Sequence, residues 1–344
     1  MNSSKPTVRL GIDLGKNCFH LWGVDEDGNP VLKKTLRRGA LLPMLANLPA
    51  CRIGLEACAG AHHWARELTP LGHDVRLMAP QFVKPYVKGN KNDYNDAEAI
   101  CEAVGRPNMR FVPVKSIEQQ DGQALHRLRQ GTLKERTALV NRLRGLLAEY
   151  GVVVPQGIGS LRRALPEILE DGENRLSADF RALLGELQEQ FVALDARIAG
   201  YDARIARQYQ SSAACQRIGQ LEGIGPQTAT AIVASLGDGS QFQDGRQLAA
   251  ALGLVPRQHS TGGKPCLLGI SKRGDRYVRT LLIHGARSAI QAVFKHDKDD
   301  ARSRWIKQLV ARRGHNVAAV ALANKNARIV WALLTRQESY RTAA

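Results

Sequence analysis

The stretch from residue 9 to residue 17, RLGIDLGKN, is a short apolar run that ends on Asp13 and Gly15, and it decides the fold of the N-terminal region. A second apolar run, NCFHLWGV, follows it, and then a DEDGNP turn and VLKKTLR, which together predict a three-stranded antiparallel meander. Helical and strand-like segments alternate after that, as LLPMLANL, CRIGLEA, GAHHWARELTPLG and DVRLMA. The order predicts a mixed α/β domain.

Four acidic residues stand where this order would bring them together. Asp13 ends the first strand, and Glu56 ends the fourth strand, in RIGLEACAG. Asp93 and Asp96 lie three residues apart in GNKNDYNDAEAI, which is about one turn of a helix. Each acid alone is more often a solvated turn or an exposed helical face, so the prediction rests on their order. That order is the one of a ribonuclease-H-like fold, with two strand ends and one helical face converging.

The expected chemistry of this cluster is that of a magnesium-dependent nuclease. Carboxylate oxygens are hard ligands that suit Mg²⁺, and two such ions can clamp the attacking and leaving oxygens of a phosphodiester. We therefore expect Asp13, Glu56, Asp93 and Asp96 to be both catalytic and metal-binding. The six cysteines include no CxxC pair, and His62 and His63 are adjacent, so the sequence indicates no competing zinc site.

The composition indicates a polyanionic partner. The chain has 344 residues, with 49 Lys and Arg against 32 Asp and Glu, a formal net charge of +17 and a pI near 9.9. Nucleic acid is the expected partner, although a structural RNA-binding protein would be equally basic. The apolar run VAAVALANKNARIVWALL is interrupted by polar residues, and MNSSKPTVRL carries no apolar signal-like segment. We expect a cytoplasmic, nucleoid-associated protein with no membrane span and with reduced thiols.

The middle of the chain, residues 116–213, is expected to be a helical coiled-coil region between an N-terminal domain of residues 1–115 and a C-terminal domain of residues 214–344. Apolar side chains recur at spacings of four and three, which predicts a seam that needs a partner helix: Phe180, Leu184, Leu187, Phe191, Leu194, Ile198, Tyr201 and Ile205. The partner could be residues 116–150 of the same chain, with Leu139, Leu143, Leu146 and Tyr150, or a second copy of the protein. Periodicity does not distinguish an intramolecular hairpin from a dimer or tetramer contact.

The C-terminal region opens with QLEGIGPQTATAIVASLG, which predicts a helix-hairpin-helix. Gly223 and Gly225 would form the tight turn, and the amides that open the second helix, near Thr228, could hold a DNA phosphate without reading sequence. The alternative is a purely structural turn between two helices. The expected fold of the whole chain is therefore α/β plus all-α.

A serine follows in the block LGLVPRQHSTGGKPCLLGISKRGDRYVRTLLIHGAR. Ser260 lies in a glycine-rich stretch among cations that are expected to contact nucleic acid: Arg257, Lys264, Lys272, Arg273 and Arg276. Such a loop could stabilise an attacking alkoxide on phosphorus, or it could bind phosphate passively.

The combination of GIDLGKN, GLEACAG, KNDYNDAEAI, LEGIGPQTA and the serine block resembles the DEDD transposases of the insertion sequence 110 family, subgroup 1111, over nearly the whole chain. The resemblance implies a RuvC-like domain that binds Mg²⁺ through the four acids and a C-terminal transposase domain with a catalytic serine, Ser260. Many relatives have glycine directly after this serine. Thr261 intervenes here and remains a rival nucleophile, although its β-branched alcohol is more hindered.

The resemblance further implies a structured non-coding guide RNA, or bridge RNA, that pairs with donor and target DNA, strand exchange through a phosphoserine, and a homo-oligomer. No nucleotide cofactor is expected. Two alternatives stay open: a RuvC-like Holliday-junction endonuclease that uses water as its nucleophile, and a non-catalytic architectural DNA-binding protein. An actin-like ATPase would also begin with GIDLG, but the sequence contains no second DxGxT phosphate loop.

Overall fold

The computed structural model of the chain describes residues 5–89 and 92–340. The chain divides into two compact units, Met1–Ser116 and Ile117–Ala344. The expected boundary between residues 115 and 116 lies within one residue of this division. The expected boundary between residues 213 and 214 lies inside the second unit.

The first unit is built on one mixed six-stranded sheet with the strand order β3-β2-β1-β4-β5-β6. Strands β1, β2 and β3 form the predicted antiparallel meander, β4 runs parallel to β1, β5 runs parallel to β4, and β6 is antiparallel to β5. The short edge strand β6 was not predicted from the sequence. The strands are β1 (Arg9–Leu14), β2 (Cys18–Val24), β3 (Pro30–Arg37), β4 (Arg52–Glu56), β5 (Asp74–Met78) and β6 (Phe111–Val112).

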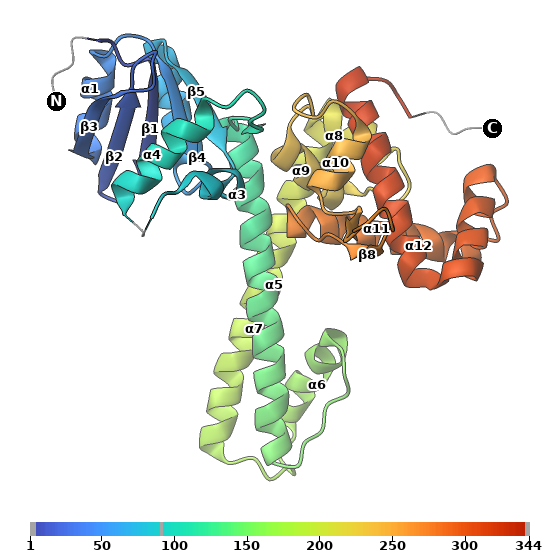
Figure 1. Ribbon diagram of the computed structural model, residues 1–344. Helices are drawn as coiled ribbons and strands as arrows, with labels where there is room; N and C mark the ends of the chain where they lie inside the picture. Colours follow the sequence, from blue (N-terminus) through green and yellow to red (C-terminus); the bar gives the residue numbers. More distant parts are fainter. Residues whose placement is uncertain (1–4, 90–91, 341–344) are drawn as a thin grey trace. The chain divides into compact units, whose positions relative to one another are not determined.

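Among the described residues, α-helices accompany this sheet, and one of them crosses its face (Figure 1). They are α1 (Leu41–Ala46), α2 (Ala61–Leu68), α3 (Pro80–Val83) and α4 (Asp93–Val104). Helix α4 packs on β1, β2 and β4. A Cβ atom at Gly11 of β1 would lie 2.1 Å from the carbonyl oxygen of Ala97, and one at Gly54 of β4 would lie 2.8 Å from Cβ of Val104. Glycine at these two positions lets the helix approach the sheet closely.

The second unit begins with two long helices that pack along each other, α5 (Ile117–Glu149) and α7 (Ala178–Ser211), accompanied by α6 (Ile158–Glu170), which was not predicted (Figure 1). Ion pairs also join the two long helices, from Arg129 to Asp202 at 2.5 Å and from Arg136 to Asp195 at 2.7 Å. The predicted seam of α7 faces this interior: Phe180, Leu184, Phe191, Ile198 and Ile205 are buried. Within this chain, α5 packs along the seam of α7, as the intramolecular alternative expects, and the seam residues Leu187, Leu194 and Tyr201 stay half-buried.

The predicted rhythm of the facing helix α5 needs one correction. Leu139 and Leu143 are buried as predicted, but Leu146 is 37% exposed and Leu147 is fully buried in its place. A strict spacing of four and three drifts on a straight helix of 3.6 residues per turn, so the buried stripe moves to the next residue. Tyr150 lies beyond the end of α5 and is 41% exposed, although its ring stacks on Phe180 with centroids 4.0 Å apart.

The rest of the second unit is largely helical and has its own core. Apolar side chains from α8, α9, α10, α11 and α12 form one buried cluster. The strands β7 and β8 form a two-stranded hairpin in this unit. The elements are α8 (Ala213–Gly219), α9 (Pro226–Leu236), α10 (Gly245–Ala251), β7 (Pro256–Gln258), β8 (Leu267–Ile270), α11 (Arg276–Lys295) and α12 (Ala301–Arg336).

Helix α12 is long and apolar enough to meet the criteria for a membrane span, contrary to the expectation that no stretch would do so. Half of the most apolar stretch of this helix is buried inside the protein. Its apolar residues, including Leu322, Ala323 and Val330, pack in the core of the second unit. The backbone also leaves helical geometry at Gly314, with φ 76° and ψ 164°. The composition of α12 is thus accounted for by burial in a protein core.

Candidate functional site

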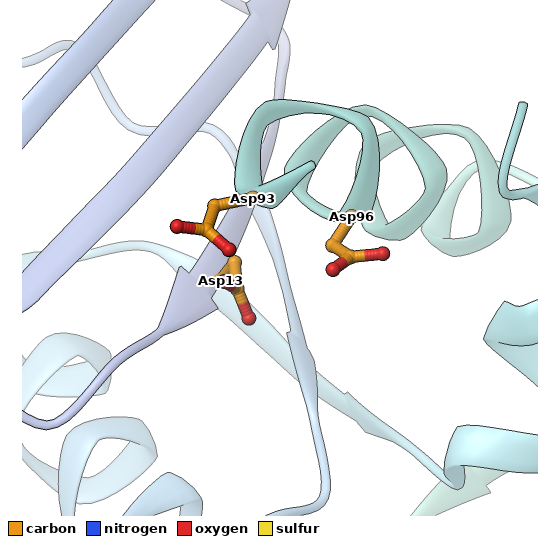
Figure 2. Close-up of side chains that lie close together, drawn as sticks. All are labelled: Asp13, Asp93 and Asp96. Atoms are coloured by element: carbon orange, nitrogen blue, oxygen red, sulfur yellow. The ribbon is translucent and has the colours of Figure 1, made fainter. Parts of the chain in front are cut away.

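The acidic cluster lies where β1 ends beside the first turn of α4 (Figure 2). One carboxylate oxygen from each of Asp13, Asp93 and Asp96 lies within 4.8 Å of the others. Asn92 caps α4 by accepting a hydrogen bond from the backbone N–H of Tyr94, so the helix begins at Asp93. The positive end of the helix dipole favours the two aspartates in this first turn.

Glu56 lies at the neighbouring strand end, outside this group of three. The parallel register pairs Ile12 of β1 with Leu55 of β4, so Asp13 and Glu56 are the next residues along adjacent strands. Burial raises the pKa of Glu56, and the charges of Asp13 and Asp96 raise it further. The structure therefore brings three of the four predicted acids within ligand distance of one another and puts the fourth within their electrostatic field.

The carboxyl group of Asp13 is partly buried among the other acids. Its pKa is raised first by burial and then by the negative charges of Asp96 and Asp93. A site that crowds carboxylates in this way holds charge that a cation would neutralise. Oxygen donors are also the ligands that divalent cations such as Mg²⁺ and Ca²⁺ prefer. The donor set therefore fits a divalent metal ion.

His20 also belongs to this site, although sequence reasoning missed it. Its Nδ1 lies 3.7 Å from Oδ2 of Asp93, and its ring packs edge-on against Tyr94 with centroids 5.0 Å apart. The antiparallel register places His20 directly opposite Asp13. Counting back from the hairpin turn around Gly15 would have found this pairing in the sequence.

Ser260 lies in an exposed hairpin of the second unit. The strands β7 and β8 pair in antiparallel fashion, and a bridge between Thr261 and Lys264 closes the tip of the hairpin. Gly262 and Gly263 both have positive φ, 58° and 75°, which a two-residue turn of this kind requires. The stretch that looked irregular in the sequence is thus an ordered turn.

The predicted cations surround this hairpin in sequence and are exposed to solvent: Arg257, Lys264, Lys272, Arg273 and Arg276. Hydrogen bonds from the interior of the unit hold the loop that carries Lys272 and Arg273. The buried guanidinium of Arg279 donates to the carbonyl oxygens of Leu252 and Arg273 at 3.0 Å and 2.7 Å. The backbone of Lys272, which has a φ of 55°, also donates to the carbonyl of Gly253 at 3.1 Å.

The predicted glycine hairpin joins α8 to α9, and its residues have different surroundings. Gly225 is exposed, and a Cβ atom there would meet open space. Gly223 has a φ of 89° and packs so closely on α11 that an added Cβ would lie 2.6 Å from the carbonyl oxygen of Gly285. Thr228 is 7% exposed on the inner face of α9. Of these three residues, Gly225 is the one open to a phosphate.

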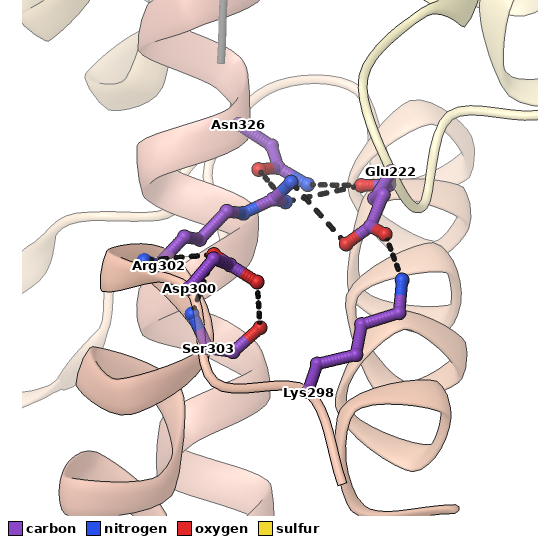
Figure 3. A network of polar contacts seen from close by, with 6 residues as sticks. All are labelled: Glu222, Lys298, Asp300, Arg302, Ser303 and Asn326. Carbon is purple, nitrogen blue, oxygen red and sulfur yellow. Dashed lines mark hydrogen bonds and ion pairs between the residues drawn. The ribbon is translucent and has the colours of Figure 1, made fainter. Parts of the chain in front are cut away.

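A polar network holds the hairpin in place (Figure 3). The carbonyl oxygen of Glu222 accepts hydrogen bonds from Arg302 at 3.2 Å and from Asn326 at 3.3 Å. The carboxylate of Glu222 pairs with Lys298 and Arg302. Because Asn326 is fully buried, the network ties an exposed turn to the middle of α12.

A six-stranded mixed sheet with clustered carboxylates, followed by a helical unit, defines a ribonuclease-H-like DEDD domain joined to a helical domain. Residues 10–152 match a family model described as "Transposase", and residues 215–303 match one described as "Transposase IS116/IS110/IS902 family". The second match lies inside the largely helical unit, which therefore contains a C-terminal transposase domain.

The relatives that cover nearly the whole of this chain include three transposases. A "Probable family 20 transposase" of Pseudomonas aeruginosa is 52% identical over 97% of this chain and 98% of its own length. The transposase for insertion sequence element IS1111A of Coxiella burnetii is 46% identical over 99% and 93%, and that for IS1328 of Yersinia enterocolitica is 41% identical over 96% and 98%. The chain belongs to the IS116/IS110/IS902 transposase family and is a DNA-cutting enzyme.

Proposed function

We propose that this transposase exchanges DNA strands through a covalent phosphoserine link formed at Ser260. The observation that carries the proposal is the exposed turn that presents Ser260 among Arg257, Lys264 and the cations of the next loop. Those cations would stabilise negative charge on the phosphate during attack. Because a covalent link conserves the energy of the phosphodiester bond, no nucleotide cofactor is needed.

We further propose that Asp13, Glu56, Asp93 and Asp96 hold Mg²⁺. The ion would supply positive charge beside the scissile phosphate. Asp13→Asn or Asp96→Asn should abolish DNA cleavage and leave DNA binding near that of the unmodified protein, because binding rests on the basic surface. Binding of Mn²⁺, followed by electron paramagnetic resonance, should weaken in the same variants. Full cleavage by either variant would exclude the assignment.

Sequence choice is proposed to come from a structured guide RNA that pairs with donor and target DNA. The net charge of +17 supports a large polyanionic partner, and a content of 5% aromatic residues leaves few rings for reading single-stranded bases. Gly225 and the exposed cations are proposed to contact phosphates without reading sequence. Sequencing of the RNA that co-purifies with the protein tests this proposal, and recovery of bulk cellular RNA alone would contradict it.

The active protein is proposed to be a homo-oligomer, a dimer or a tetramer, acting on nucleoid DNA in the cytoplasm. Because the seam of α7 is filled by α5 of the same chain, the subunit contact would use other surfaces. The acids and Ser260 belong to different units, and a mixture of Asp13→Asn and Ser260→Ala proteins tests whether subunits complement each other. Recovered activity would support a composite site. Light scattering of the purified protein tests the assembly itself.

The experiment that separates this proposal from hydrolysis is trapping on a nicked DNA substrate. A serine nucleophile leaves the protein covalently attached to DNA, and the adduct survives denaturant. Ser260→Ala should lose both the adduct and recombination, whereas Thr261→Ala should keep them. An adduct mapped to Thr261, or cleavage without any adduct, would overturn the serine assignment and favour water as the nucleophile.

A further inference from the structure

The hydroxyl oxygen of Ser260 accepts two hydrogen bonds from within its own hairpin. The side-chain amide of Gln258 donates from Nε2 at 2.9 Å, and the backbone N–H of Cys266 donates at 3.1 Å. Gln258 and Ser260 are two residues apart in extended chain, so their side chains leave the backbone on the same side. The carbonyl of Cys266 also accepts from the backbone N–H of His259 at 2.9 Å, which fixes the opposing strand.

Two donors on one hydroxyl have a chemical consequence. A serine oxygen has two lone pairs and one hydrogen, so Gln258 and Cys266 together occupy both lone pairs. The O–H bond of Ser260 must then point away from them. If the proton leaves, both N–H groups remain in place and stabilise the alkoxide, as the donors of an oxyanion hole do.

The neighbouring Thr261 lies differently in the turn. It closes the tip of the hairpin by pairing with Lys264, whose backbone N–H donates to the carbonyl of Thr261 at 3.1 Å. The pair of donors is directed at Ser260, the residue before it. This difference gives the two rival alcohols different surroundings.

We propose that Gln258 is a positioning residue that orients and activates the hydroxyl of Ser260 for attack on DNA. The inference rests on the proposed role of Ser260 as the nucleophile. In the step it assists, the Oγ–P bond forms and the P–O3′ bond breaks, the Ser260 proton passes to water, and the 3′ oxygen takes up a proton from solvent. When DNA covers the exposed hairpin, fewer water molecules compete with the two donors for the oxygen of Ser260.

The test compares adduct formation by the unmodified protein, Gln258→Met and Gln258→Ala, each purified with its bound nucleic acid and given the same nicked DNA. Both variants lose the donor, and methionine keeps the length of the side chain. Since hydrogen bonds to charged groups are the stronger ones, the rate at neutral pH should fall about ten- to a hundredfold. The rise of the rate with pH should shift to higher pH in both variants, while DNA binding by gel shift stays unchanged.

Leu267→Ala is the matched control, because Leu267 pairs with Gln258 across the hairpin and is 66% exposed. It disturbs the same strand pair and leaves both donors, so its rate and pH profile should stay near those of the unmodified protein. The inference would be overturned if both Gln258 variants kept the rate and pH profile of the unmodified protein. It would also be overturned if Leu267→Ala slowed adduct formation as much as the Gln258 variants do and none of the variants shifted the pH profile. A Ser260→Ala protein that still forms the adduct would instead overturn the proposed function.

Discussion

The acidic cluster and the serine hairpin are held in place by different means. Asp13 and Asp96 stand on elements whose inner faces are fully buried, and α4 is pressed against β1 through Gly11. Ser260 stands on a hairpin whose residues are almost all exposed and whose shape rests on two glycines and a few hydrogen bonds. The acidic cluster is thus positioned by the core of its unit, whereas Ser260 is positioned by its own hairpin, which is accessible to a ligand.

The largest effect is expected where the core sets the acids. Gly11→Ala would place a methyl group 2.1 Å from the carbonyl oxygen of Ala97 and push α4 off the sheet. Since overpacking costs about 1–3 kcal/mol and backbone yields less than a side chain, we expect a loss of about 3 kcal/mol or more in the free energy of unfolding. DNA cleavage should be lost as well, because Asp93 and Asp96 move with α4.

Gly39→Ala is the control for this prediction, since an added Cβ at Gly39 meets nothing within 4 Å. Chemical denaturation and a cleavage assay measure both variants. Wild-type stability and cleavage in Gly11→Ala would show that the close approach of α4 is not what positions the acids.

Because the position of the acids depends on packing, the sequence could predict the elements that carry them but not how those elements dock. The meander and the strand that ends at Glu56 followed from apolar runs and turns, and the spacing of Asp93 and Asp96 followed from helical periodicity. The docking of α4 through Gly11 could not be predicted, because it depends on which face of the helix meets the sheet. The hairpin of β7 and β8 was missed for a different reason: its short strands are exposed and lack an alternating apolar pattern.

The second prediction concerns pH and the scaffold of the serine unit. His126 of α5 is buried between Tyr277 and Thr230, with each of its ring nitrogens 3.0 Å from a hydroxyl. Burial, helped by the charge of Arg129, lowers the pKa of His126 to about 4. The unfolded chain, with a histidine pKa near 6.5, binds more protons between these values, so this stability is full above pH 6.5 and is lost as pH falls toward 4. The loss is about 3 kcal/mol at most.

A comparison of the unmodified protein with His126→Gln separates the contribution of His126 to the pH dependence of stability from that of other groups. The first unit contains its own histidine with a lowered pKa, His62, which is also about 4 because of burial and the nearby charges of Lys115 and Arg66. Denaturation at pH 7 and pH 5 should therefore show a shallower pH dependence for the second unit of the variant and an unchanged one for the first. Equal slopes in the two proteins would argue against the buried histidine.

The third prediction tests the crowding of charge in the acidic cluster. Because the pKa values of Asp13 and Glu56 are raised, the folded state loses stability as pH rises through them. Asp13→Asn should thus raise the melting temperature at pH 7 without metal. Mg²⁺ at a hundredfold excess over its dissociation constant should stabilise the unmodified protein by about 2.7 kcal/mol and the variant much less.

Glu26→Gln removes an exposed carboxylate outside the cluster and serves as the control, with a melting temperature and a metal response like those of the unmodified protein. Calorimetry with and without Mg²⁺ measures all three proteins. A metal response that Asp13→Asn retains in full would place the bound ion elsewhere.

The smallest effect is expected in the network that fixes the glycine hairpin, where a buried and an exposed contact share one acceptor residue. Asn326→Ala removes a fully buried amide that donates to the carbonyl of Glu222 and accepts from Arg302, and the loss of this buried partner of a charged group should cost about 1–3 kcal/mol. Lys298→Ala removes a partner of the Glu222 carboxylate at the surface, which should cost less than about 1 kcal/mol. Chemical denaturation measures the free energy of unfolding of both variants. Added salt should reduce the loss caused by Lys298→Ala and leave the loss caused by Asn326→Ala unchanged. If Lys298→Ala caused the larger loss in the free energy of unfolding, the glycine hairpin would be stabilised mainly by surface charge and not by its contact with α12.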